Sequence, residues 1–287
     1  MRAGFAIASV LGLFLCANFA AAQDARVPDS QIAYFQEKNI FHSGLVGTHT
    51  IALTFDDGPN ANTQAVLDVL KQNGVKATFF IVGKMAKAHP DVLARVAAEG
   101  HLLANHSATH PLLGKRYVNH PELLLAQIRD VNDEIAPLMP KGTKLFFRAP
   151  YGSWRAQHAA VLNADPVLKF YVGPIYWDIG GQTTISADGY VLEAADWNCW
   201  HRHWDADICA KGYMREIRRR DGGIVLMHCV GKKAGELVAD VVPALIEEGY
   251  RFVRLDQMPA YDKYQTPPET APLVASTGGR QHVAVLQ

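Results

Sequence analysis

The stretch Thr54-Phe55-Asp56-Asp57-Gly58-Pro59 decides the fold class of this 287-residue chain and points to its site. The apolar run Ile51 to Phe55 is typical of a buried strand, and the Gly-Pro pair turns the chain sharply after it. Asp56 and Asp57 therefore lie at the carboxyl end of a strand, where active sites gather in α/β sheets and barrels. Because adjacent carboxylates repel each other, we expect each to need a cation or a proton. A metal would bind one and leave the other free as a base.

A second polar cluster, Asn105-His106-Ser107-Ala108-Thr109-His110-Pro111, also follows a short apolar strand. On a helical turn His106 and His110, four positions apart, share one face and can bind one cation. The cluster differs from the zincin motif, because Ser107 stands where that motif needs Glu, so a carboxylate must come from elsewhere. Asp57 is the obvious source. Two neutral imidazoles and one carboxylate leave an open coordination position, as in catalytic zinc sites.

Three further polar groups follow in the chain. Arg148-Ala149-Pro150-Tyr151-Gly152 comes after the apolar segment 145–147, and His228 comes after the apolar segment 224–227. Between them, Asp196-Trp197 lies in a loop rich in aromatic residues. Taken singly, each could be an ordinary surface or half-buried side chain. Together, however, the five polar clusters indicate an active site.

The ordered set TFDDGP, HSATH, RAPYG, a DW pair and LMH resembles the polysaccharide deacetylases, carbohydrate esterase family 4, over about residues 46–255. The resemblance implies an α/β fold, a distorted (β/α)7 barrel with the active site at its strand ends. It also implies removal of N-acetyl groups from GlcNAc polymers with one divalent metal. The alternation of predicted elements agrees with parallel strands and helical crossovers. We expect strands near 49–55, 77–82, 101–104, 145–147, 170–177, 223–228 and 250–253, and helices near 62–73, 90–99, 120–138, 154–163, 211–220 and 233–248.

The resemblance also implies a metal set and a base. Asp57, His106 and His110 would hold the metal, and their nitrogen and oxygen ligands favour zinc. The metal would acidify a bound water and polarise the acetamide carbonyl. Asp56, the carboxylate left off the metal, would be the general base. Arg148 would pair with Asp56, orient it and keep it ionised.

The remaining matched residues would complete the reaction. His228, as imidazolium, would protonate the departing amine. The backbone N–H of Tyr151 would help to stabilise the oxyanion. Trp197 and Leu226 would wall the substrate groove.

The segment 178–210 departs from the family pattern, because it is long and places an aromatic-rich insertion before the next helix. We take Asp196 as the acid that tunes His228, with Asp178 and Glu193 as the alternatives. Four rings of the insertion could stack on sugar faces or could simply order the loop. They are Trp200, His201, His203 and Trp204.

The start of the chain predicts export. Arg2, an apolar run from Ile7 to Phe14 and the small residues 20–22 are typical of a secretory signal peptide. The run is short for a membrane span, so we expect no membrane anchor after cleavage and a periplasmic or secreted location. In such a compartment Cys199 and Cys209 could form a disulfide, with free thiols as the alternative.

Length and composition agree with one large domain. The chain has 28 basic and 28 acidic residues, so no nucleic-acid footprint is expected. The predicted segments are a signal peptide (1–22), an N-terminal extension (23–45), a polysaccharide deacetylase domain (46–260) and a flexible tail (261–287). We expect a carbohydrate polymer as partner, a cell-wall glycan, with peptidoglycan favoured over chitin oligomers and exopolysaccharide. A non-catalytic carbohydrate-binding protein and a zinc peptidase or amidase of the cell wall are the alternatives.

Overall fold

The computed structural model of the protein describes residues 35–40, 46 and 48–267. The predicted signal peptide lies outside the described residues, as do residues 268–287 of the predicted tail. Among the described residues, no helix combines the length and the apolar character that a membrane span needs.

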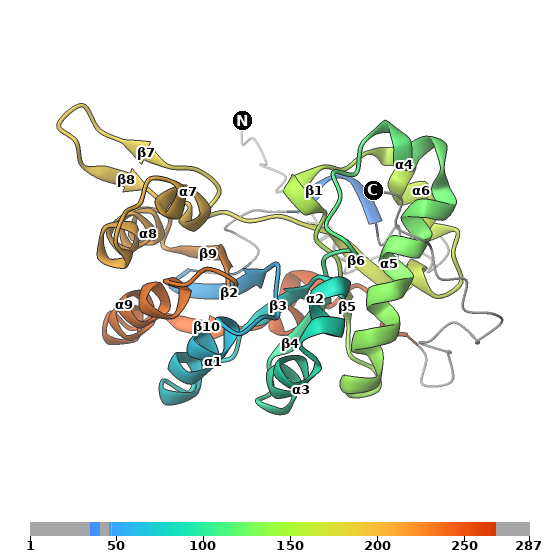
Figure 1. Ribbon diagram of the computed structural model, residues 1–287, viewed down its shortest axis with the longest axis horizontal. Helices are drawn as coiled ribbons and strands as arrows, with labels where there is room; N and C mark the ends of the chain where they lie inside the picture. Colours follow the sequence, from blue (N-terminus) through green and yellow to red (C-terminus); the bar gives the residue numbers. More distant parts are fainter. Residues whose placement is uncertain (1–34, 41–45, 47, 268–287) are drawn as a thin grey trace, which may run out of the picture. The chain divides into compact units, whose positions relative to one another are not determined.

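A parallel sheet forms the centre of the domain (Figure 1). Its five strands are β2 (Thr50–Asp56), β3 (Thr78–Ile81), β4 (Leu102–Asn105), β9 (Gly222–His228) and β10 (Arg251–Val253). β9 pairs with β2 along its whole length, whereas β10 pairs with the first half of β2 and β3 with the second half. Two strands therefore share one edge of β2, which distorts the regular order of a barrel.

A second parallel sheet completes the barrel. It has the order β1 (Phe35–Ile40), β6 (Tyr171–Ile175) and β5 (Leu145–Phe146). Isolated parallel bridges join Asn105 to Phe147 and Ile179 to Val225, so the two sheets meet beside β4 and again beside β9. The predicted distorted α/β barrel is confirmed, and each of the seven predicted strands is present.

Helices follow most of the strands. They are α1 (Thr63–Gln72), α2 (Gly83–Ala88), α3 (Pro90–Ala98), α4 (Lys115–Asn119), α5 (Pro121–Ile135), α6 (Ala156–Asn163), α7 (Asp196–His201), α8 (Ala206–Arg220) and α9 (Ala234–Glu247). α1 buries Val66, Leu67 and Leu70, spaced as one helical face requires, and it packs against α9. α9 packs in turn against α8, which places α8 next to the strand that carries His228.

The strands bury their side chains in apolar clusters, one around β2, β3 and β9 and another around β5 and β6. Phe55 of β2 and Phe79 of β3 are fully buried and stack with ring centroids 5.0 Å apart. Strands that are apolar on both faces leave polar side chains only at their ends. This is why the polar residues that follow β2, β4 and β9 converge at one end of the barrel.

Two boundaries differ from the sequence prediction. The N-terminal extension contributes β1, which pairs with β6. The tail does not begin at residue 261, because Tyr261 is 1% exposed and Tyr264 is 4% exposed. The ring of Tyr261 packs edge-on against Phe146, with centroids 5.2 Å apart. The packed domain therefore continues beyond the predicted limit of 260.

The insertion near 178–210 is more regular than a loop. It forms an antiparallel hairpin of β7 (Thr184–Ile185) and β8 (Val191–Glu193), then α7. α8 begins at Ala206, five residues before the predicted start at 211. Figure 1 shows the hairpin extending away from β9 on the side of α7 and α8.

Candidate active site

Asp56, the last residue of β2, is held by a buried arginine. Nη1 of Arg148 donates to Asp56 Oδ1 at 2.6 Å and to Thr54 Oγ1 at 2.9 Å. The other donors of Arg148 go to backbone carbonyls, at 3.1 Å from Ile175 and 3.2 Å from Tyr176. Arg148 is 1% exposed, so its alternative interpretation as a surface cation is wrong. The guanidinium is fixed in place and can orient the carboxylate.

Burial and this ion pair act on Asp56 in opposite directions. Burial raises the pKa of the Asp56 carboxyl, because removal from water disfavours the charge. The charge of Arg148 lowers it and is the largest opposing influence. On balance the pKa of Asp56, which is only 3% exposed, lies above its ordinary value, and the guanidinium limits that rise and so favours the ionised form that a general base needs.

Asp57, His106 and His110 form a group with metal-ligand geometry. Their ligand atoms all lie within 4.8 Å of one another. Asp57 Oδ1 lies 3.6 Å from His106 Nε2 and 3.2 Å from His110 Nε2. Burial lowers the pKa of His106 to about 3, so its imidazole is neutral at physiological pH and its nitrogen can bind a cation.

Two observations fit a cation at this group. Nδ1 of His106 lies 2.8 Å from the Arg148 carbonyl, and because a carbonyl only accepts, Nδ1 carries the proton. The lone pair of Nε2 then faces Asp57. Asp57 Oδ1 is buried and has no hydrogen-bond partner among the described residues, which is unfavourable unless a cation satisfies it. Asp56 Oδ2 lies only 3.5 Å from His106 Nε2, so the base borders the same space.

The backbone around the metal group is strained. Asp57, Ser107, His110 and Tyr151 have φ values of +72°, +68°, +58° and +58°, a region that side-chain-bearing residues seldom adopt. Such strain gathers at functional sites, where the surrounding structure holds it. The segment 106–110 is not the predicted helical turn but an irregular loop. The two histidines still converge, because these left-handed residues redirect the chain.

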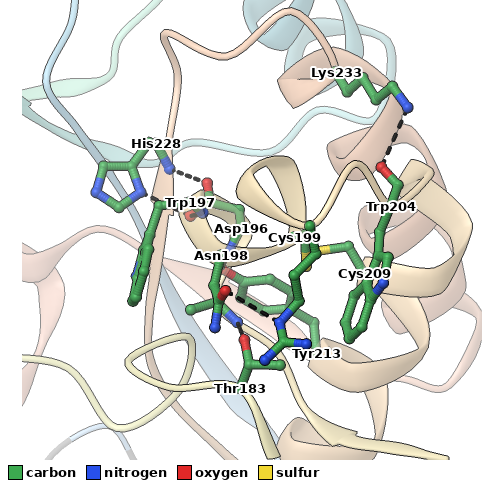
Figure 2. The surroundings of a disulfide bond; sticks show 12 residues. Thr183, Asp196, Trp197, Asn198, Cys199, Trp204, Cys209, Tyr213, His228 and Lys233 are labelled. Carbon is green, nitrogen blue, oxygen red and sulfur yellow. Dashed lines mark hydrogen bonds and ion pairs between the residues drawn. A yellow bond between two sulfur atoms is a disulfide. The ribbon is translucent and has the colours of Figure 1, made fainter.

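The imidazole of His228 lies beside the base on the neighbouring strand. In the β2–β9 ladder His228 is the direct partner of Asp56. Its Nδ1 lies 2.7 Å from Asp196 Oδ1, and its backbone N–H donates to Asp196 Oδ2 at 2.6 Å (Figure 2). Asp196 Oδ1 also accepts from the Trp197 N–H at 2.8 Å. Both carboxylate oxygens are therefore satisfied, and both hold His228.

This contact decides between the three candidate acids of the insertion. Asp178 accepts from the Ile224 N–H at 2.9 Å, and Glu193 pairs with Arg219. Burial by itself would lower the pKa of His228, but the charge and hydrogen bond of Asp196, with smaller contributions from Asp57 and Asp56, raise the pKa to about 10. His228 is thus an imidazolium at neutral pH, with its Nε2 free of Asp196 and able to donate a proton.

Comparison with known proteins agrees with this geometry. The family model described as polysaccharide deacetylase matches residues 44–167. A peptidoglycan-N-acetylglucosamine deacetylase of Bacillus cereus is 40% identical over 221 residues, which cover 75% of this chain and 70% of that protein. The chain belongs to the polysaccharide deacetylases, carbohydrate esterase family 4, a family of hydrolases.

Two further polysaccharide deacetylases are similar to the chain. A chitooligosaccharide deacetylase of Rhizobium leguminosarum bv. trifolii is 42% identical over 148 residues, 51% of this chain and 64% of that relative. The chain thus spans less than two thirds of that relative's length. The structure of the peptidoglycan deacetylase PdaC from Bacillus subtilis superposes with a TM-score of 0.56 at 27% identity, covering 74% of this chain and 90% of that one.

The residues expected to wall the substrate groove of this polysaccharide deacetylase differ in their exposure to solvent. Tyr151 is 69% exposed and Trp197 is 52% exposed, so both can offer ring faces to a sugar. The Tyr151 ring also packs edge-on against His110, with centroids 4.7 Å apart. Leu226 is 4% exposed and lies on the same face of β9 as His228, two residues before it, so its place as a wall of the groove stays a prediction. Trp200 and Trp204 pack against the core, which orders the insertion.

The predicted disulfide between Cys199 and Cys209 is confirmed, and it ties α7 to α8. Cys229 is a buried free thiol, and burial raises its pKa to about 12, so it is no nucleophile. A Cβ at Gly58 would lie 2.4 Å from Cys229 Sγ, so the glycine after the two aspartates lets β9 approach closely.

Two supporting residues escaped the sequence prediction. Thr54 donates to the Val225 carbonyl at 2.7 Å while it accepts from Arg148. Asn105 accepts from the Ser107 N–H at 3.0 Å and donates to the Ile128 carbonyl at 2.8 Å, which secures the loop that bears both histidines. The sequence did contain a signal for both residues: Thr54 is a polar residue inside an apolar strand, and Asn105 is a polar residue at the end of one.

Proposed function

We propose that this protein is a metal-dependent N-deacetylase that removes acetyl groups from the GlcNAc residues of peptidoglycan. One observation carries the proposal. A carboxylate base paired with Arg148 and an imidazolium paired with Asp196 occupy partner positions on adjacent strands, beside the group of metal ligands. Amide hydrolysis needs a proton acceptor and a proton donor at one carbonyl, and this arrangement supplies both.

Asp57, His106 and His110 would hold the metal, and their one oxygen and two nitrogen ligands favour zinc. When bound, a divalent ion there would supply Lewis-acid polarisation of the acetamide carbonyl and a lowered pKa of water. The neutral state of His106 and the unpartnered oxygen of Asp57 support this assignment.

The protein's own residues would move the protons. Asp56 would accept a proton from the attacking water as the water oxygen joins the acetyl carbon. The backbone N–H of Tyr151 would donate to the developing oxyanion. His228 would deliver its Nε2 proton to the nitrogen as the C–N bond breaks, which yields acetate and a free amine. Asp196 would stabilise the imidazolium until that transfer.

The choice of polymer rests on the relatives and on the surface at the site. The Bacillus cereus relative is named for peptidoglycan N-acetylglucosamine. The exposed rings of Tyr151 and Trp197 suit the apolar faces of sugars. We further propose that the protein acts in the periplasm or outside the cell, since disulfides persist in oxidising compartments. Fractionation of cells would test this, and retention in the cytoplasm with reduced cysteines would refute it.

Acetate release from purified peptidoglycan tests the activity, with mass spectrometry of the digested muropeptides to locate the free amine. We expect a loss of one acetyl group per modified GlcNAc, slowed by about 100-fold or more in Asp56→Asn. Loss from N-acetylmuramic acid instead would contradict the sugar assignment. Binding to the glycan without acetate release, in zinc-loaded protein, would favour a non-catalytic carbohydrate-binding protein. New peptide termini without acetate would favour a cell-wall peptidase or amidase.

Chitooligosaccharides are the second candidate substrate, because the Rhizobium relative with 42% identity is named for them. The same assay on GlcNAc oligomers separates the two. A kcat/KM for oligomers at least about 10-fold above that for muropeptide glycan strands would assign the protein to this substrate.

A further inference from the structure

The last residues of β9 have an unusual set of partners on the side away from β2. The segment that pairs there runs alongside β9 only as far as Ile179, whose carbonyl accepts from the Leu226 N–H at 2.9 Å. Beyond Ile179, two side chains make the hydrogen bonds to the backbone of β9 that a neighbouring strand would otherwise make. The Leu226 carbonyl accepts from the Tyr213 hydroxyl at 2.9 Å, and the His228 N–H donates to Asp196 Oδ2 at 2.6 Å.

The two replacing side chains are joined to each other. The Tyr213 hydroxyl, while it donates to Leu226, accepts from the backbone N–H of Asp196 at 3.2 Å. That N–H belongs to the first residue of α7, and the first N–H groups of a helix have no partner inside it. One hydroxyl therefore connects the segment that bears Asp196 to the strand that bears His228.

The surroundings of Tyr213 are arranged around this hydroxyl. Tyr213 is fully buried, and burial raises its pKa well above 10, so it remains a donor. Gly180 has φ +88°, and a Cβ there would lie 2.2 Å from the Leu226 carbonyl oxygen and 3.0 Å from the Tyr213 hydroxyl. Only a glycine leaves room for this contact. Figure 2 shows Tyr213 lying beside Asp196, with His228 on the far side of the carboxylate.

We propose that Tyr213 is a positioning residue for proton donation, which acts by setting the place of Asp196 relative to His228. The proposal rests on the proposed deacetylase activity. This positioning role differs from the role of a tyrosine that only packs in the core. Such a tyrosine would stabilise the fold without affecting proton donation in particular. Without the hydroxyl, the start of α7 loses one of its ties to β9, and only the hydrogen bonds between Asp196 and His228 then hold the carboxylate near the imidazole.

Tyr213→Phe removes the hydroxyl and keeps the ring. In zinc-loaded protein at pH 8 we expect kcat for acetate release to fall about 10-fold, as for a small misplacement of a catalytic group, with KM changed less than about 2-fold. The decisive comparison is a double-mutant cycle with Asp196→Asn. If Tyr213 acts through Asp196, Tyr213→Phe should change kcat less than about 2-fold in that background.

Tyr261→Phe is the matched control. Tyr261 is also buried, and its hydroxyl has no hydrogen-bond partner among the described residues. This variant should keep kcat and KM within about 2-fold of wild type. A pH profile adds a third measure: in Tyr213→Phe the alkaline limb should move to lower pH. The charged groups that act on His228 there are Asp196 of α7 and the carboxylates of Asp56 and Asp57.

Equal fold losses in both backgrounds, or a change confined to KM, would overturn the proposal. So would failure of Tyr213→Phe to fold while Tyr261→Phe folds, because the hydroxyl would then serve stability alone. Wild-type protein that releases no acetate refutes the deacetylase activity itself, which is a different result from an additive cycle in an active enzyme.

Discussion

Replacing Asp196 by asparagine should convert a broad pH profile into a narrow one. The carboxylate accepts from Nδ1 of His228 at 2.7 Å and raises the pKa of that imidazole from its ordinary 6.5 to about 10. A group with a raised pKa stays protonated until the pH passes that raised value. Because His228 must be protonated to donate, activity should persist well above neutrality in the wild type, and its alkaline limb should appear only as the pH approaches about 10.

The magnitude follows from the two pKa values. Without the charge of Asp196, burial is opposed only by the carboxylates of Asp57 and Asp56, and we expect the pKa of His228 to fall to about its ordinary 6.5. At pH 8 the protonated fraction then drops from nearly all to about 3%, a loss of roughly 30-fold in kcat/KM. At pH 6 the loss from protonation is less than about 2-fold. The acid limb, which reports on Asp56, should stay in place.

Measurement of kcat/KM between about pH 5 and 10 tests this, since that parameter reports the pKa values of the free enzyme. Asp178→Asn and Glu193→Gln are matched controls, because each makes the same carboxylate-to-amide change in the same insertion without a hydrogen bond to His228. Their alkaline limbs should coincide with that of the wild type. An unmoved limb in Asp196→Asn, or an equal shift in either control, would refute the reasoning.

Three further predictions concern the base, the metal and the disulfide. Asp56→Asn should lower kcat by about 100-fold or more while zinc content is retained, as for loss of a general base; loss of the metal from this variant, with retention in Asp57→Asn, would reverse the two roles. Chelation should abolish acetate release and zinc or cobalt should restore it, while His106→Ala should bind less than one equivalent by elemental analysis; full activity in metal-free protein would contradict the metal role. The double variant Cys199→Ser/Cys209→Ser should lose about 3 kcal/mol of unfolding free energy by the loop-closure account. Reductant should destabilise the wild type but not this variant, and an equal effect on both would show that the bond contributes nothing.

The metal group and the base followed from sequence because Asp56 ends a strand, Asp57 and His106 come directly after strands, and His110 follows His106 four positions later. A strand end fixes where a side chain emerges, and the apolar runs before Asp56 and His106 made those ends visible. The histidine loop shows the limit of this reasoning: the spacing of His106 and His110 indicated convergence, but the left-handed backbone that produces it left no mark on the pattern.

The partner of His228 could not be decided in the same way. Asp178, Glu193 and Asp196 lie in an insertion whose path depends on long-range contacts, including the disulfide to α8. Tyr213 was hidden for a related reason, since a tyrosine on the inner face of an amphipathic helix is indistinguishable from packing. Tyr261 and Tyr264 follow the last strand without any periodic pattern. The sequence therefore predicted a flexible tail there, although both rings are buried.

The two ends of the hairpin in the insertion differ in how well they should tolerate a substitution: the stem is held by hydrogen bonds, whereas the turn is exposed. Its stem is bound to the helix start, where Thr183 Oγ1 accepts from the Ala195 N–H at 3.2 Å. Its turn, at residues 187–189, is exposed, and a Cβ on Gly189 would meet nothing within 4 Å. Among the described cysteines, two are bonded to each other and Cys229 is buried. Asp188→Cys would therefore provide a single reactive handle for a fluorophore or a surface tether, so that the enzyme could be followed or immobilised without labelling its catalytic strands.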